Sequence, residues 1–466
     1  MGCTRSLLKI WGKFTVISVL VLSQWLPSPV WAAFASQLSL SLGEEYNDNI
    51  FFTKKKETDF VTIITPTLHL YYAPTGRAEP TLNLNISPSG QIYARHGELS
   101  SFGDNSAING GYTYFYSPRL TFSLSESFTR QGETRSLGSS QQGFQVPLTP
   151  TTPFPVGAPV PSSSNLNNFI SAGDQYTNEL AFQGNFLFRP DISFSGGYTN
   201  TYTKFIDRGG SDLFHTFGIR GIYNWRQDHN LHAGYSVSFT NPRNGDSGVI
   251  HNFDFGDDYF TGQEYTIQFT PTLSLSASTG LSINTSTSGP RVANNSTITI
   301  TKLWETASLT GGLRKGLTPS FGVSGISDTA SLFTNFSIQL AERLTGNAAA
   351  DYSFYDTEDV NFKTFQASAG LQYVFTTWLY STLSYVYRSI DSGAGAAKTD
   401  LLSRGTVNGN SVFLSITARF DLWPNTGLAR NLSSSSLSPV LRTPFPSAPV
   451  STVPTAPTTP TTPAKP

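Results

Sequence analysis

The sequence is poor in several features that would place it in a common class. It has one cysteine, Cys3, and one methionine, Met1. Cys3 lies in a basic leader, so the chain after the leader has no disulfide and no thiol chemistry. After the leader, no stretch approaches the roughly 18 consecutive apolar residues that a membrane-spanning helix needs. A membrane protein with this sequence must therefore cross the bilayer with strands.

The first residues have the pattern of a secretory signal peptide. Three basic residues precede the apolar run 14–26, and small residues follow it up to Ala32. We predict a leader over residues 1–32, with cleavage after Ala32. Without it the chain keeps 27 basic and 31 acidic residues, a net charge of −4. Nothing in this balance predicts a nucleic-acid partner.

Residues 411–423, SVFLSITARFDLW, divide into two faces at period 2. One face is wholly apolar, and the other is polar apart from Phe413. Segments of about ten residues with this alternation recur back to the N-terminus, which is typical of a transmembrane β-barrel. We predict an all-β fold, a transmembrane antiparallel up-and-down β-barrel over residues 33–423, with about 18 strands, or 16 if one hairpin is miscounted. An even number places both ends of the barrel on the periplasmic side.

Short and long connections alternate along this barrel. Three short turns share a proline pattern, YSPRLTFS at 116–123, FRPDISFS at 188–195 and FTPTLSLS at 269–276. Proline suits such turns because its φ is fixed and it has no N–H to donate to a strand ladder. The third turn predicts that the tenth strand runs through Tyr265, Ile267 and Phe269. Glu126 falls in the apolar phase of its strand, which predicts a bulge or a place beyond the apolar band.

Two proline-rich segments do not fit the strand pattern. Residues 131–173 contain PLTPTTPFPVGAPVPSSS, and we predict a long external loop that controls access to the pore. Residues 424–466 end in PTAPTTPTTPAKP, and we predict a disordered periplasmic tail.

Two blocks carry a resemblance to a known family. Residues 45–52, EYNDNIFF, with Asp59-Phe60 and Pro66 near the start, and residues 313–325 with 340–345 later, resemble a family of bacterial outer-membrane β-barrel porins. That family is found beside exopolysaccharide and protein-sorting gene clusters. The resemblance implies a barrel in the cell outer membrane with a link to polysaccharide export, and it implies no catalytic residue.

Side chains in the polar phase of their strands are the candidates for lining the pore. Charges facing the lumen tune the selectivity of such barrels, although the same charges could instead pair structurally across the wall. Aromatic residues in the polar phase, with Phe413, leave open a sugar-binding path, whereas those near the turns fit an interfacial girdle. The pore-lining candidates are Arg220, Arg314, Arg419, Glu179, Tyr355 and Tyr380. Phe420 and Trp423 resemble the C-terminal signal that the barrel assembly machinery recognises.

No catalytic or metal motif is visible, and we predict no enzyme, no metal and no cofactor. His229 and His232 are close in sequence without a third ligand nearby, and Asp254, Asp257 and Asp258 fit a solvated rim better than a cation site. We predict a porin-like channel for passage or export of polar solutes, with polysaccharide among them. The alternatives are a non-conducting scaffold and, third, a barrel enzyme acting on lipid or polysaccharide. The expected partners are outer-membrane lipid, the assembly machinery, and polysaccharide or export components.

Overall fold

The computed structural model describes residues 34–72, 81–132, 174–206, 209–226, 229–241, 247–261, 272–286, 289–319, 326–357, 361–392 and 405–423. Apart from one short 3-10 helix, these residues form strands joined by turns and loops. The strands are β1 (Phe34–Asn47), β2 (Asp59–Tyr72), β3 (Thr81–Ser87), β4 (Gly90–Tyr93), β5 (Ser101–Phe102), β6 (Ala107–Ser117), β7 (Leu120–Gln131), β8 (Gln175–Arg189), β9 (Ile192–Phe205) and β10 (Ser211–Arg226). They continue with β11 (His229–Asn241), β12 (Gly248–Thr261), β13 (Leu273–Ser286), β14 (Gly289–Leu303), β15 (Ala307–Pro319), β16 (Ile326–Ala341), β17 (Leu344–Asp356), β18 (Asn361–Thr376), β19 (Leu379–Ser392) and β20 (Gly405–Trp423).

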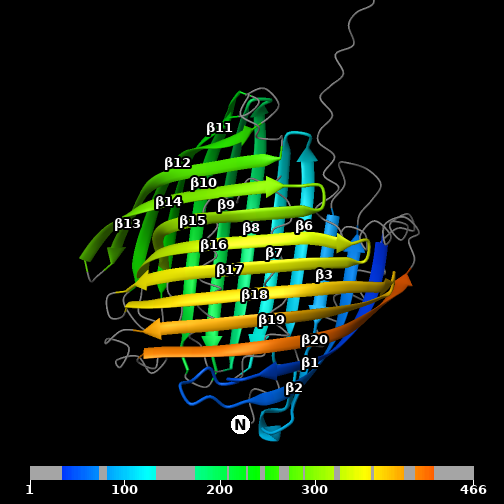
Figure 1. Cartoon of the computed structure of the whole chain (residues 1–466). Helices are drawn as coiled ribbons and strands as arrows, with labels where there is room; N and C mark the ends of the chain where they lie inside the picture. The colour runs from blue at the N-terminus through cyan, green and yellow to red at the C-terminus, as the bar shows by residue number, and fades with distance from the viewer. Residues whose placement is uncertain are drawn as a thin grey trace, which may run out of the picture.

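These strands close into a single antiparallel barrel, as the side-by-side course of β20 and β1 in Figure 1 shows. From β6 to β20 each strand pairs with the next strand in the sequence, and β1 pairs with both β2 and β20. Within the wall, β3 and β4 together occupy one position, and β5 and β6 occupy the next. The barrel therefore has 18 strands, as predicted from the alternation.

The tight turns lie at one end of the barrel and most of the long connections at the other. Following the predicted topology, we call these the periplasmic end and the external end. The strand ends confirm the turns between Ser117 and Leu120 and between Arg189 and Ile192. The predicted leader 1–32, residues 133–173 of the predicted loop and the tail 424–466 lie outside the described residues.

The predicted place of the tenth strand is wrong, because β12 occupies Gly248–Thr261. Tyr265, Ile267 and Phe269 lie outside the described residues. The sequence pattern concealed β12 because two of its outward positions are polar. The His251 ring contacts the Tyr235 hydroxyl, 2.8 Å from Nδ1, and Asp257 pairs with His229. Cross-strand partners of this kind let polar side chains occupy an outer face.

The register places an apolar face outside and a polar face inside. Between β1 and β20, Leu38 pairs with Phe420 and Leu42 with Ile416 on the outer face. Ser41 pairs with Thr417 on the inner face, where their hydroxyls are 3.1 Å apart. An apolar exterior around a polar interior is the arrangement of a barrel that spans a membrane.

Glu126 lies on this outer face, in a regular part of the ladder. The register between β6 and β7 shifts only near the turn, between Phe115 and Ser117. The Glu126 carboxylate accepts a hydrogen bond of 3.0 Å from the Asn178 amide on β8. The predicted bulge is therefore absent at this place in the described strands, and a neighbouring amide partly satisfies the carboxylate instead.

Aromatic rings cover the outer face close to the periplasmic turns. Exposed examples are Tyr116, Phe188, Trp225, Phe375 and Trp378. Rings at this level fit the interface between the hydrocarbon and the lipid headgroups. No helix among the described residues is long and apolar enough to cross a membrane.

Candidate functional site

The first external loop, residues 48–58, folds into a compact structure instead of extending into solvent. Asn49 organises it, because its side-chain amide donates to the carbonyls of Thr53 and Asn408 at 2.7 and 2.9 Å, and its side-chain oxygen accepts from the Thr53 N–H. Ile50 follows and is only 1% exposed. Asn side chains commonly organise turns in this way. The segment EYNDNIFF therefore encodes a folded loop at the external end.

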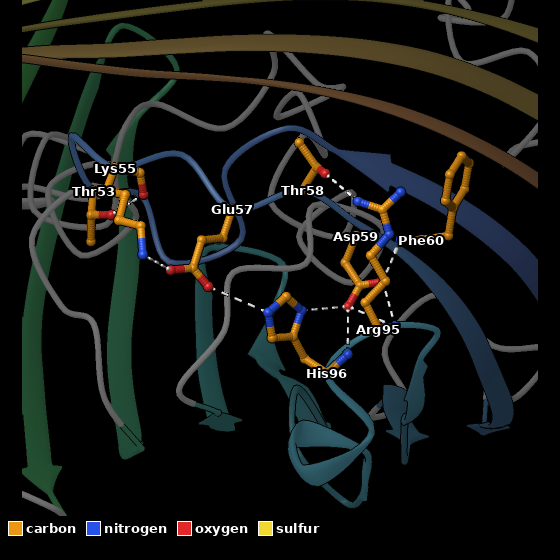
Figure 2. A network of polar contacts seen from close by, with 8 residues as sticks. All are labelled: Thr53, Lys55, Glu57, Thr58, Asp59, Phe60, Arg95 and His96. Carbon is orange, nitrogen blue, oxygen red and sulfur yellow. Dashed lines mark hydrogen bonds and ion pairs between the residues drawn. The ribbon is translucent and has the colours of Figure 1, made fainter.

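The second external loop is held to the first through Asp59 (Figure 2). Its carboxylate is fully buried and accepts hydrogen bonds of 3.0 Å from the backbone N–H groups of Arg95 and His96. The Phe60 N–H donates to the same carboxylate at 2.8 Å. A buried carboxylate with several backbone donors is a strong local constraint, because each bond involves a charged acceptor.

His96 is held between two carboxylates. Its Nδ1 lies 2.8 Å from Asp59 and its Nε2 lies 3.3 Å from Glu57. Both ring nitrogens can donate only in the imidazolium form. The hydrogen bond to Asp59 raises the pKa of His96 above its ordinary value, with Glu98 and Glu57 acting in the same direction. The Phe51 ring meets the imidazole edge to face.

An apolar cluster lies on the inner face of the barrel beneath these loops. Val61 and Ile63 of β2, Tyr93 of β4 and Phe413 of β20 are buried together, and Leu99 packs against them. Leu99 belongs to the 3-10 helix η2 (Gly97–Leu99) of the second loop. This loop therefore folds inward. We call loops 48–58 and 94–100 together the cap.

A glycine makes room for this cluster. On β1, a Cβ at Gly43 would lie 2.5 Å from two carbons of the Phe413 ring. Phe413 pairs with Glu45 across the β1–β20 ladder, so its ring extends along the inner wall over the glycine. Without a side chain at Gly43 the ring can lie flat against the wall beneath the cap.

The packed inner layer extends around the external ends of β17, β18 and β19. Tyr355 faces inward, as its phase predicts, but it is fully buried and stacks on Phe362 with ring centroids 4.7 Å apart. Arg388 is also buried, and the Phe52 ring of the cap lies 5.6 Å from its guanidinium. On this side of the barrel, Tyr355 packs within the layer and does not contact water.

Two of the three predicted pore arginines lie against aromatic rings of the inner wall. The Arg314 guanidinium lies 4.2 Å from the Phe333 ring centre, and Arg419 lies 4.6 Å from that of Tyr380. Phe333 is the direct cross-strand neighbour of Asp351, whose charge acts on Arg314. Aromatic stacking and a nearby opposite charge both hold a guanidinium to the wall.

Arg220 has a different environment. Among the described residues it has no ion pair, hydrogen bond or aromatic contact, and its buried Nε has no hydrogen-bond partner. Ser195, its direct neighbour on β9, is 6% exposed, and its hydroxyl also has no partner. The structure therefore brings together a guanidinium and a hydroxyl that no protein group satisfies.

Exposed polar side chains line the inner wall of β3, β7 and β8. Asn83 of β3, Ser125 of β7 and Glu179 of β8 face inward and are exposed. Asn83 and Ser125 lie in one cross-strand row, because both pair with Gly111 of β6. Glu179 pairs with Ser127 and lies two residues nearer the external end. Polar groups exposed on the inner face of three strands, at two levels, indicate water along this wall.

The other predicted residues are placed as follows. Phe420 is on the outer face and half exposed, and Trp423 is the last residue of β20. Asp254 faces inward and Asp257 outward, so these two carboxylates do not meet, and no group of three metal-ligating side chains occurs among the described residues. The cap was not predicted; its one sequence signal was the dense Asn and Asp content of residues 45–59.

No protein-family model and no curated protein matches the chain. Among solved structures, it is similar to OccK2 of Pseudomonas aeruginosa at 9% identity and a TM-score of 0.44, covering 84% of this chain and 98% of that one. It is also similar to a BenF-like porin from Pseudomonas fluorescens Pf-5, at 8% identity and a TM-score of 0.45, covering 83% of this chain and 99% of that one. At such low identity and TM-score the likeness carries no argument about function, which has to come from the barrel itself.

Proposed function

We propose that this chain is an outer-membrane channel for small polar solutes. The observation that carries the proposal is the exposed inner wall, with Asn83 and Ser125 in one cross-strand row and Glu179 nearer the external end. A barrel of 18 strands is wide enough to enclose an aqueous channel unless loops fill it. The cap covers the apolar cluster on β2, β4 and β20, whereas Glu179 near the external end of β8 is exposed. Solute passage then follows β3, β6, β7 and β8.

Conductance of the refolded full-length protein in planar bilayers tests the proposal. Stepwise openings support a channel. A barrel that is folded by its heat-modifiable migration but electrically silent overturns it and favours the non-conducting scaffold. A second variant makes the test specific: replacing Ser125 by Trp should lower the unit conductance, because a bulky ring would enter the route. Replacing the outward Leu124 by Trp is the matched control and should leave the conductance unchanged.

Export of polysaccharide is a finer prediction that rests on the sequence resemblance. Liposome swelling with glucose and with linear oligosaccharides of increasing length tests it. Rapid uptake of long oligomers would support an export role. Exclusion of all but the smallest sugars would restrict the channel to small solutes.

A further inference from the structure

The inner wall from β8 to β12 carries a row of polar side chains at the level of Arg220. Cross-strand pairing aligns Asn185, Ser195, Arg220, Gly234 and Asp254 in this order. Inward side chains on neighbouring strands lie about 5 Å apart. The row therefore presents its functional groups side by side to the lumen.

One end of this row is a set of donors without acceptors. Arg220 and Ser195 are direct cross-strand neighbours, and both have buried polar atoms with no partner. Buried polar atoms are nearly always hydrogen-bonded in proteins. Two adjacent exceptions, one of them on a cation, point to a bound group that accepts hydrogen bonds. A carboxylate fits, because a guanidinium can bind both of its oxygens.

The other end of the row is an acceptor. The Asp254 carboxylate leans over Gly234, in the space that a Cβ at that glycine would need. It thereby extends from β12 towards Arg220 on β10. No ion pair joins Asp254 to Arg220 among the described residues, so the two charged groups do not bridge each other directly. Asp254 also lies 3.9 Å from Nε2 of His232.

We propose that this row is a binding subsite for a small zwitterion of the amino-acid class. Its carboxylate binds Arg220 and Ser195, and its ammonium group binds Asp254. The charges of Arg220 and Asp254 determine which class of solute binds best. A simple carboxylate would meet the repulsion of Asp254, and a simple cation that of Arg220, whereas a zwitterion complements both. The subsite deepens the proposed channel function and rests on it for its biological use, but binding itself does not require conduction.

Ligand-detected NMR titration of the full-length protein in detergent tests the subsite. Three probes of matched size separate the charges: alanine, propionate and propylammonium. We expect alanine to bind most tightly. Arg220→Gln should weaken both alanine and propionate by about tenfold, whereas Asp254→Asn should weaken alanine by about tenfold and leave propionate unchanged or tighter.

The control is Lys315→Gln, which removes one positive charge from the outer face of β15. It should leave all three affinities unchanged. Heat-modifiable migration shows that each variant is folded. Equal binding of alanine and propionate in the parent and in Asp254→Asn would show a simple anion site and overturn the proposal, as would the absence of alanine binding. Alanine binding to a barrel that is silent in bilayers would overturn the channel and leave the subsite standing.

Discussion

Replacing Asp59 by alanine should release the second loop of the cap from the lumen. The buried carboxylate accepts backbone hydrogen bonds from Arg95, His96 and Phe60 and contacts the His96 ring. Only the bonds to Arg95 and His96 join it to the second loop. Without the carboxylate, the loop would keep Leu99 on the inner apolar cluster and the contacts of the His96 ring with Glu57 and Phe51.

The size of the effect follows from these bonds. A hydrogen bond to a charged group contributes roughly 1.5–3 kcal/mol, and an undocked loop recovers part of this by hydration of its N–H groups. A net loss of about 2 kcal/mol lowers the ratio of docked to undocked loop about 30-fold, since each 1.4 kcal/mol is a factor of ten. An undocked loop leaves more of the external mouth open.

Single-channel recording is the assay. The Asp59→Ala variant should show a larger mean conductance and more frequent transitions between levels than the parent. Asp391→Ala is the matched control, because Asp391 is an exposed carboxylate at the external end of β19 with one side-chain hydrogen bond, from Thr406. If Asp59→Ala and Asp391→Ala both keep the parental conductance, and the second loop resists external protease in both, Asp59 does not hold the cap.

Further outcomes follow from other parts of the barrel. Because the pKa of His96 is raised above the ordinary 6.5, its contribution to loop docking should be complete below about pH 6.5 and lost as the pH rises through its folded-state pKa. Single-channel recordings from roughly pH 5 to 9 should show this loss of docking as a rise in conductance in the parent and not in His96→Gln. Glu126→Leu should raise stability to urea in lipid vesicles by about 1 kcal/mol, because it removes a carboxylate from the lipid-facing side. Gly280→Ala should lower stability by about 1–3 kcal/mol, because its Cβ would collide with the backbone of β12. Truncation after Trp423 should leave a heat-modifiable barrel in the membrane, and failure to assemble would contradict an independent tail.

The alternation in the sequence was enough to predict the strands, because in a barrel wall each residue meets either lipid or the lumen. The period-2 pattern of residues 411–423 corresponds to the faces of β20. The prediction failed at β12, where His251 and Asp257 stand on the outer face with cross-strand partners. A polar residue at an outward position interrupts the apolar alternation in the sequence. The sequence pattern does not show the partner on the neighbouring strand that makes this position tolerable.

The environments of the three arginines could not be predicted from the same pattern. Arg220, Arg314 and Arg419 all fall in the polar phase of their strands. From this phase alone, all three are predicted to line the pore. Their surroundings differ through residues on neighbouring strands, such as Phe333 beside Arg314 and Tyr380 beside Arg419. Which residues lie opposite each other on neighbouring strands decides these contacts. The alternation along one strand does not reveal that pairing.

The uneven interior explains why the cap lies where it does. Val61, Ile63 and Phe413 face the lumen, and apolar side chains in water cost about 25 cal/mol for each Å² exposed. They need a cover, and Leu99 of the second loop provides it. On β3, β7 and β8 the inner side chains are polar, so water can fill that side at no such cost. A cap that lifted completely would expose the apolar cluster, and this penalty limits how far the loops can move. Opening should therefore be a partial displacement that widens the existing route along the polar wall.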